Sequence, residues 1–174
     1  MLDGAEPTVT EGAYRTHAAR NDPPPIQRRL PILVGGSGPN VTLRLVAQYA
    51  DACNLGGTPA EVAEGEAALR RHCEAVGRDH REIERTVGIG VPVIRDSREE
   101  ARRVLEGIFR HNGDAPLWDD QPVGTPEDVV ERLAPIVALG YHHLVAGFPA
   151  PYDEESMTRL SAEVRPRLEA MVRA

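Results

Sequence analysis

The stretch from residue 31 to residue 57 reads PILVGGSGPNVTLRLVAQYADACNLGG. Its first residues, Pro31–Gly35, form an apolar run that is typical of a strand buried on both faces of a sheet. Residues 39–50 follow as an expected helix, whose apolar positions have helical spacing: Val41, Leu45, Val46 and Tyr49. Asp51–Leu55 then has the composition of a second strand. This strand–helix–strand order predicts two parallel strands joined by a crossover helix.

The same alternation continues to the end of the chain. Two further strands are expected, at Thr86–Ile94 and at His142–Ala146. Four further helices are expected: from Thr58 to Val76, from Ser97 to Arg110, from Thr125 to Leu139, and over Glu154–Val172. The first three of these open on capping-box sequences, and Gly77 is placed to end the first. The pattern predicts an α/β fold over residues 31–174, with about four parallel strands and flanking helices.

Residues 1–30 have no such rhythm. The run Pro23-Pro24-Pro25 stops any helix there, and a small hairpin around Tyr14–His17 is the one local pairing expected. We therefore divide the chain into an irregular lead-in segment, 1–30, and one domain, 31–174.

The number of units limits the architecture. A closed eight-stranded (β/α) barrel needs about 250 residues, whereas this chain has 174 residues and four strand–helix units. The pattern is equally compatible with half of a TIM barrel and with a small open doubly wound sheet.

Composition narrows the class of protein. A net charge of −7 argues against binding nucleic acid or an anionic membrane surface. The chain has no lysine, so Schiff-base chemistry is excluded. Cys53 and Cys73 form no CxxC motif, which indicates reduced thiols and a cytoplasmic protein. No apolar run approaches the ~20 residues that span a bilayer, and Met1 does not begin a signal peptide.

Two glycine-rich turns follow the first two expected strands. The first is Gly35-Gly36-Ser37-Gly38, and the second is Asn54-Leu55-Gly56-Gly57. Glycines let backbone N–H groups turn toward a ligand, and Pro39 sits where a helix with its positive dipole end would begin. Because parallel strands end at the same edge of a sheet, both turns are expected to face one phosphate. The alternative is that the glycines only permit tight turns.

Two familiar glycine motifs do not fit the first turn. A dinucleotide fingerprint needs glycine or alanine three residues after Gly38, where Val41 stands. A phosphate-loop NTPase needs a lysine, and the chain has none.

The segment Pro31–Gly57 resembles the fifth and sixth strands of luciferase-like monooxygenases, above all the branch that uses the deazaflavin coenzyme F-420. Three further stretches support the resemblance: Leu69–Asp79, Val123–Glu127 and Gly140–Leu144. The resemblance implies a (β/α)8 barrel, of which this chain would be the C-terminal half, and an oxidoreductase that transfers hydride with coenzyme F-420 or, alternatively, FMN. It also implies that residues 35–38 and 54–57 contact the cofactor phosphate.

This chain departs from the family in its length. Members of that family run past 300 residues, and the resemblance implies that the strands with the ring-binding and proton-transfer groups would come before residue 1. No catalytic residue is therefore assigned, and the chain is expected to be a fragment, a shortened gene product or one with a misassigned start. The substrate would be a small organic molecule.

Other residues carry weaker signals. His142 and His143 are neighbours on a strand, so they are expected to face opposite sides and to bind no common metal. Cys53 is expected to be a core thiol, and the loop 111–122, with Trp118 and Asp119-Asp120, a solvated loop. The alternative to an oxidoreductase is a non-catalytic half-barrel, which self-associates into a homodimer through its exposed strand edges and apolar inner face. A third possibility is a fragment of an FMN-dependent monooxygenase.

Overall fold

A computed structural model describes residues 4–114 and 121–173 of the chain. Residues 115–120 of the polar loop expected over 111–122, with Trp118, Asp119 and Asp120, lie outside these residues. The chain divides after Ile32 into two compact units, residues 1–32 and residues 33–174. Among the described residues of the first unit there is no helix, and its one strand-like feature is an isolated antiparallel bridge between Val9 and Thr16.

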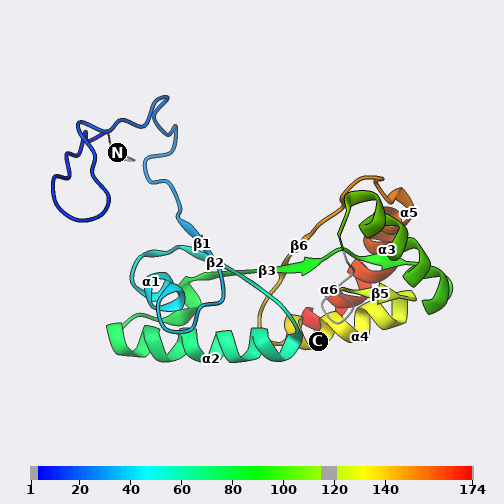
Figure 1. Cartoon of the computed structure of the whole chain (residues 1–174). Helices are drawn as coiled ribbons and strands as arrows, with labels where there is room; N and C mark the ends of the chain where they lie inside the picture. The colour runs from blue at the N-terminus through cyan, green and yellow to red at the C-terminus, as the bar shows by residue number, and fades with distance from the viewer. Residues whose placement is uncertain (1–3, 115–120, 174) are drawn as a thin grey trace. The chain divides into compact units, whose positions relative to one another are not determined.

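The second unit is built on a parallel sheet. In the described part of the chain this sheet has four strands in the order β1-β2-β3-β6 (Figure 1). Their bounds are β1 Leu33–Gly35, β2 Ala52–Gly56, β3 Glu84–Gly90 and β6 His143–Ala146. All three strand pairs are parallel, so every strand ends at the same edge. The predicted α/β fold with four parallel strands is confirmed.

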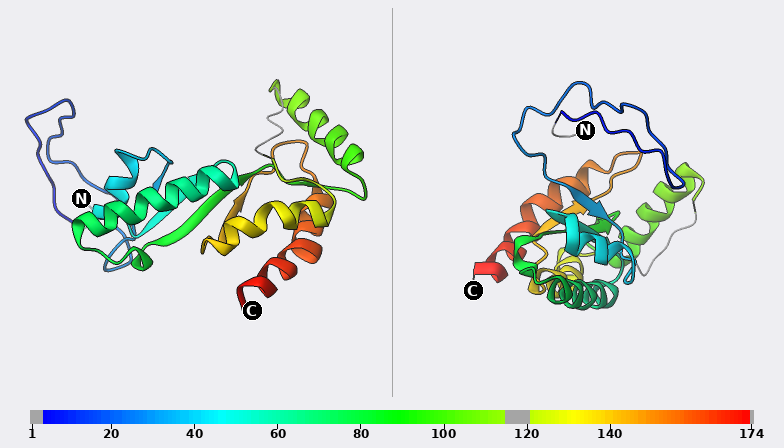
Figure 2. Two further views of the ribbon diagram at one scale, coloured as in Figure 1. Left: turned by 90° about the horizontal axis from the view of Figure 1, so that it is seen from below. Right: turned by 90° about the vertical axis from the view of Figure 1, so that its left-hand side faces the viewer.

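Helices cover one face of this sheet. They are α1 (Thr42–Tyr49), α2 (Pro59–Val76) and α4 (Pro126–Ala138), with the terminal helical segment α5 (Glu154–Arg159), a π-helical turn (Leu160–Val164) and α6 (Arg165–Arg173) beside α4. Figures 1 and 2 show α1, α2 and α4 along the same side of the strands. The main apolar core lies between these helices and the sheet. Successive strand residues point to opposite faces, so half of each strand's side chains face away from the helices.

A capping box and a left-handed glycine explain where α2 begins and ends. The Thr58 hydroxyl accepts the Glu61 N–H, and the Glu61 carboxylate accepts the Thr58 N–H at 2.8 Å. Gly77 closes the helix at a φ of 69°. Thr125 and Asp128 form the same reciprocal pair on α4. At α3 (Arg98–Asn112) Ser97 accepts the Glu100 N–H, and the return half of the predicted capping box is absent from the contacts of these described residues.

A buried carboxylate fixes α2 to the sheet. Glu66 is 2% exposed, and Arg85 on β3 donates to both of its oxygens at 2.9 and 3.0 Å. Arg70 and the Tyr141 hydroxyl donate to it as well. Burial alone would raise the pKa of Glu66, but the hydrogen bonds from Arg85 and Arg70 outweigh it and lower that pKa.

The predicted burial of the first strand is wrong, and the helix after it shows which of its apolar residues are buried. Strand β1 is not buried on both faces, since Leu33 is 56% exposed at the edge of the sheet. On α1 the buried residues are Leu43, Val46 and Ala47, whereas three of the four predicted apolar positions, Val41, Leu45 and Tyr49, are exposed. The helix itself is as predicted, and the face that it packs against the sheet is formed by Leu43, Val46 and Ala47.

The prediction of one continuous third strand over Thr86–Ile94 is also wrong. Strand β3 ends at Gly90, and β4 (Val93–Ile94) pairs in parallel with β5 (Val123–Gly124) in a separate two-stranded sheet of the described residues. Pro92 stands at the break, where it cannot donate a ladder hydrogen bond.

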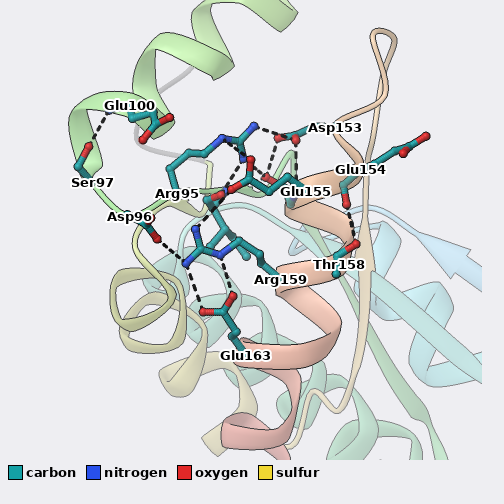
Figure 3. Close-up of polar contacts among 12 residues, drawn as sticks. Arg95, Asp96, Ser97, Glu100, Asp153, Glu154, Glu155, Thr158, Arg159 and Glu163 are labelled. Carbon is teal, nitrogen blue, oxygen red and sulfur yellow. Dashed lines mark hydrogen bonds and ion pairs between the residues drawn. The ribbon is translucent and has the colours of Figure 1, made fainter.

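A polar cluster joins this second sheet to the start of α5 (Figure 3). The buried Arg95 donates to the Ser156 hydroxyl at 3.0 Å and to Asp153 at 2.9 Å, and the Ile94 N–H donates to the same hydroxyl at 2.8 Å. Burial would raise the pKa of Asp153, but hydrogen bonds from Arg95 and Ser156 keep it lowered. The cluster therefore holds the segment that leaves β3 against the beginning of the terminal helix. None of the described helices combines the length and apolar character of a membrane span.

Candidate functional site

The two glycine turns lie together at the edge where the strands end. The Gly36 N–H donates to the Asn54 carbonyl at 3.0 Å. The Ser37 hydroxyl accepts the Gly56 N–H at 3.4 Å and lies 3.5 Å from the Gly56 carbonyl. Each turn thus holds the other, and the expected neighbourhood of residues 35–38 and 54–57 is present.

Not every residue of these turns is available to a ligand. Asn54 and Leu55 belong to β2 and not to the turn that was expected there. Leu55 is 1% exposed and packs against Gly65 of α2, so its side chain is core. The N–H groups of Gly36 and Gly56 are already used between the turns. The remaining backbone of the first turn, around Ser37 and Gly38, is what a ligand could approach.

Three glycines of the first turn have distinct roles. A side chain at Gly35 would meet no heavy atom within 4 Å, so nothing within the described chain requires glycine there. Gly36 has a φ of 117°, a conformation that favours glycine. A Cβ at Gly38 would lie 2.9 Å from the Thr42 hydroxyl. Gly36 and Gly38 therefore shape the turn, while Gly35 leaves open space beside it.

The two helices that follow these turns begin differently. Helix α1 has no side-chain cap at Val41 and no acidic residue in its first turn. Helix α2 begins with the Thr58–Glu61 capping box. The hydrogen bonds from the Thr58 backbone and hydroxyl lower the pKa of Glu61, so it stays negatively charged. The Leu43 N–H in the first turn of α1 already donates to the Gly38 carbonyl at 3.1 Å. A helix start without a side-chain cap or an acid still presents its positive dipole end and its remaining N–H groups to an anion, and one closed by a carboxylate does not.

The second turn is crowded by that carboxylate. Gly57 has a φ of 110°, and a Cβ there would lie 2.5 Å from the Glu61 carboxylate. An anion beside Gly57 would meet like charge. The electrostatics of the pair of turns therefore favour an anion near residues 35–38 and α1.

The helix-free face of the sheet is lined by small residues next to these turns. Gly35, Asn54, Thr86 and His143 lie in register across the four strands, and Gly56, Gly88 and Val145 form the next row. The Thr86 hydroxyl donates to the Asn54 side chain at 2.8 Å. A side chain at Gly56 or Gly88 would make only ordinary contact with neighbouring backbone. Gly35, Gly56 and Gly88 thus place no side chain on this face, whereas Thr86 is buried, with 2% of its surface exposed.

Sequence reasoning missed Thr86 and Gly88 as members of this face. The alternation Thr86-Val87-Gly88-Ile89-Gly90 contained the signal, because period two places Thr86, Gly88 and Gly90 on one side. The His143 ring nitrogen lies 3.1 Å from Glu84, and His142 lines a groove on the helix side. Both histidines also border a second hollow beside Glu84 and Arg85, and His142 precedes β6, so their placement on opposite sides of the sheet stays a prediction. The described residues contain no group of three or more potential metal-ligating side chains.

The parallel sheet with helices joining its strands defines a β/α protein. The sequence profile of the luciferase-like monooxygenases matches residues 1–121, and the chain belongs to this family. A comparison with curated proteins finds no match.

Solved structures with the same fold are distant in sequence. A coenzyme F-420-dependent tetrahydromethanopterin reductase from Methanopyrus kandleri superposes with a TM-score of 0.73 at 17% identity, over 96% of this chain and 59% of that one. A secondary alcohol dehydrogenase in complex with an F-420–acetone adduct gives 0.65 at 15% identity, over 98% and 57%. The oxygenating constituent of 3,6-diketocamphane monooxygenase from Pseudomonas putida, in complex with FMN, gives 0.62 at 19% identity, over 94% and 59%. The chain thus spans little more than half of these relatives.

Proposed function

We propose that the chain is the C-terminal half of a luciferase-like (β/α)8 barrel and holds the phosphate of coenzyme F-420 or FMN at the turn formed by residues 35–38. The observation that carries the proposal is the uncapped start of α1 beside the open space at Gly35. The similar proteins named above include two whose names specify F-420 and one bound to FMN.

The residues of the chain fit such a phosphate. Gly35 has no side chain to block its approach, and the N–H groups at the start of α1 would donate to its oxygens. The Ser37 hydroxyl, hydrogen-bonded to Gly56, braces the turn against β2. The second turn, Gly56-Gly57, would support the first and contribute little direct contact, because Glu61 lies beside it.

The helix-free face would then lie under the ring system. Asn54, Thr86 and Gly88 lie on that face, where Asn54 and Gly88 are partly exposed and Thr86 is buried, and the Thr86–Asn54 hydrogen bond fixes the amide. A bound flavin or deazaflavin would supply hydride transfer to or from a small organic substrate. This chain binds and orients; the groups that move protons are proposed to lie on strands outside it.

The test is a fluorescence titration of the chain with F-420, with FMN and with riboflavin, which lacks the phosphate. The proposal expects FMN to bind at least tenfold more tightly than riboflavin, which corresponds to about 1.4 kcal/mol. Equal affinities would show that the phosphate is not held. No binding of F-420 or FMN at high micromolar concentration would overturn the cofactor assignment.

A further inference from the structure

Helix α1 is held at both ends by side chains that come from α2 and from the turn after it. Just before α1 begins, the Nε2 atom of His72 lies 2.7 Å from the Pro39 carbonyl oxygen. In the last turn of α1, the Arg78 guanidinium donates to the carbonyls of Val46 and Ala47 at 3.4 and 3.3 Å. A cation at that end is favourable because the helix dipole is negative there. The two contacts together fix α1 relative to α2.

The contact at the start of α1 defines which nitrogen of His72 carries a proton. A carbonyl oxygen only accepts hydrogen bonds, so the Nε2 atom beside Pro39 must be an N–H donor. His72 lies on α2 and is partly exposed. Its ring is therefore a donor that α2 supplies to the backbone between the first glycine turn and α1.

The direction of the Pro39 carbonyl decides what the backbone presents at the start of α1. The peptide bond between Pro39 and Asn40 is trans, so its C=O and N–H groups point in opposite directions. Because the carbonyl points to His72 on α2, the Asn40 N–H points away from α2. Among the described residues this N–H has no hydrogen-bond acceptor. A rotated peptide unit would present the carbonyl in its place, and the carbonyl dipole repels an anion.

We propose that His72 is a positioning residue of the phosphate site. By holding the Pro39 carbonyl toward α2, it keeps the Asn40 N–H directed to the phosphate. His72 acts through the peptide unit 39–40 and does not touch the phosphate itself. The inference rests on the proposed function, which places a phosphate beside residues 35–38 and the start of α1.

The first measurement uses the full chain without cofactor. Nitrogen NMR of the imidazole rings, at a mildly alkaline pH where histidine rings are neutral, reports which nitrogen carries the proton. The proposal expects the Nε2–H tautomer for His72, whose signals are assigned by their loss in His72→Gln. It also expects His72→Leu to shift the Asn40 amide signal more than that of Ala50, at the other end of α1. An Nδ1–H tautomer, or an unmoved Asn40 amide, would overturn the inference.

The second measurement compares the affinities of the variants for FMN and for riboflavin, which lacks the phosphate. His72→Leu removes the donor, whereas His72→Gln keeps an N–H donor on its side-chain amide. We expect His72→Leu to reduce the preference for FMN over riboflavin about fivefold, and His72→Gln to keep it within about twofold of wild type. Ala75→Leu is the matched control, because it places a leucine at an exposed position of α2 without removing a donor.

Riboflavin separates positioning from a general loss of structure. A purely structural role of His72 would lower the affinities for FMN and riboflavin together, and that result would overturn the inference. A preference for FMN that persists in His72→Leu would overturn the role of His72 and leave the phosphate site standing. Equal affinities of wild type for FMN and riboflavin would instead contradict the proposed function, and with it any role of His72 toward a phosphate.

Discussion

The starts of α1 and α2 follow neighbouring strands, both after glycine turns, and yet they are built differently. Helix α2 satisfies its own first N–H groups with Thr58 and Glu61, as α4 does with Thr125 and Asp128. Helix α1 has neither a cap nor an acid. The open start beside Gly35 is the one that a phosphate would complete, which is why we place the cofactor on the α1 side.

The largest effect should come from the buried carboxylate that fixes α2 to the sheet. Glu66→Gln leaves Arg85 buried without its counter-charge, so we expect it to lower the free energy of unfolding by about 3 kcal/mol. Glu169→Gln, in an exposed pair with Arg165, should leave it nearly unchanged. Urea denaturation of both variants measures the difference.

The Glu66–Arg85 pair also predicts that the stability of the fold depends on pH. The folded-state pKa of Glu66 is lowered, so its contribution to stability is present above the unfolded value of about 4.3 and is lost as the pH falls through the folded value. Wild type should lose more stability than Glu66→Gln on acidification below about pH 4. Equal losses of stability in the two proteins would show that Glu66 does not cause the pH dependence.

Filling the open space tests the α1 side of the comparison. Gly35→Val adds a side chain where the described chain has no neighbouring atom, so the fold should be unchanged. We expect FMN affinity to fall at least tenfold, about 1.4 kcal/mol. Gly107→Ala, also in open space but on α3, is the control that should bind normally. Unchanged binding by Gly35→Val would place the phosphate elsewhere.

Removing the cap tests the α2 side. Thr58→Ala should cost about 1 kcal/mol of stability, because it leaves the Glu61 N–H unsatisfied. Its affinity for FMN should stay within about twofold of wild type, since Glu61 already excludes an anion from that helix start. Thermal unfolding and the FMN titration are measured on the same preparation, and a large loss of affinity would contradict the asymmetry of the two turns.

The smallest effect is electrostatic. Asn40→Asp adds one negative charge beside the start of α1 with little change of shape, and should weaken FMN binding about threefold, or 0.7 kcal/mol, less at high salt. Gln48→Glu adds the same charge near the other end of α1 and should have less effect. Equal effects of the two substitutions would mean that the phosphate does not lie at the helix start.

Features that depend on a few consecutive residues could be predicted from the sequence. The capping pairs at Thr58 and Thr125 and the helix end at Gly77 need only local geometry, and the structure has them. The two glycine turns were predicted to lie together because parallel strands share an edge, and they do.

Features that depend on packing could not be predicted. Periodicity does not say which apolar residues of α1 face the sheet, and Val41, Leu45 and Tyr49, which have helical spacing, are exposed. The Thr86–Asn54 hydrogen bond depends on the register of two strands 32 residues apart. The sequence shows that α1 lacks a capping residue where α2 has one. Only the structure shows how closely the Glu61 carboxylate approaches Gly57, which is why an anion is disfavoured at the start of α2.

The central claim is that a phosphate lies at the start of α1 and not at the start of α2. A backbone amide NMR titration of the full chain with FMN tests it most directly. The account predicts that the largest shifts fall on the amides of residues 35–42, with little change at Gly57–Glu61. Shifts concentrated at Gly57–Glu61, or absent from residues 35–42, would contradict it.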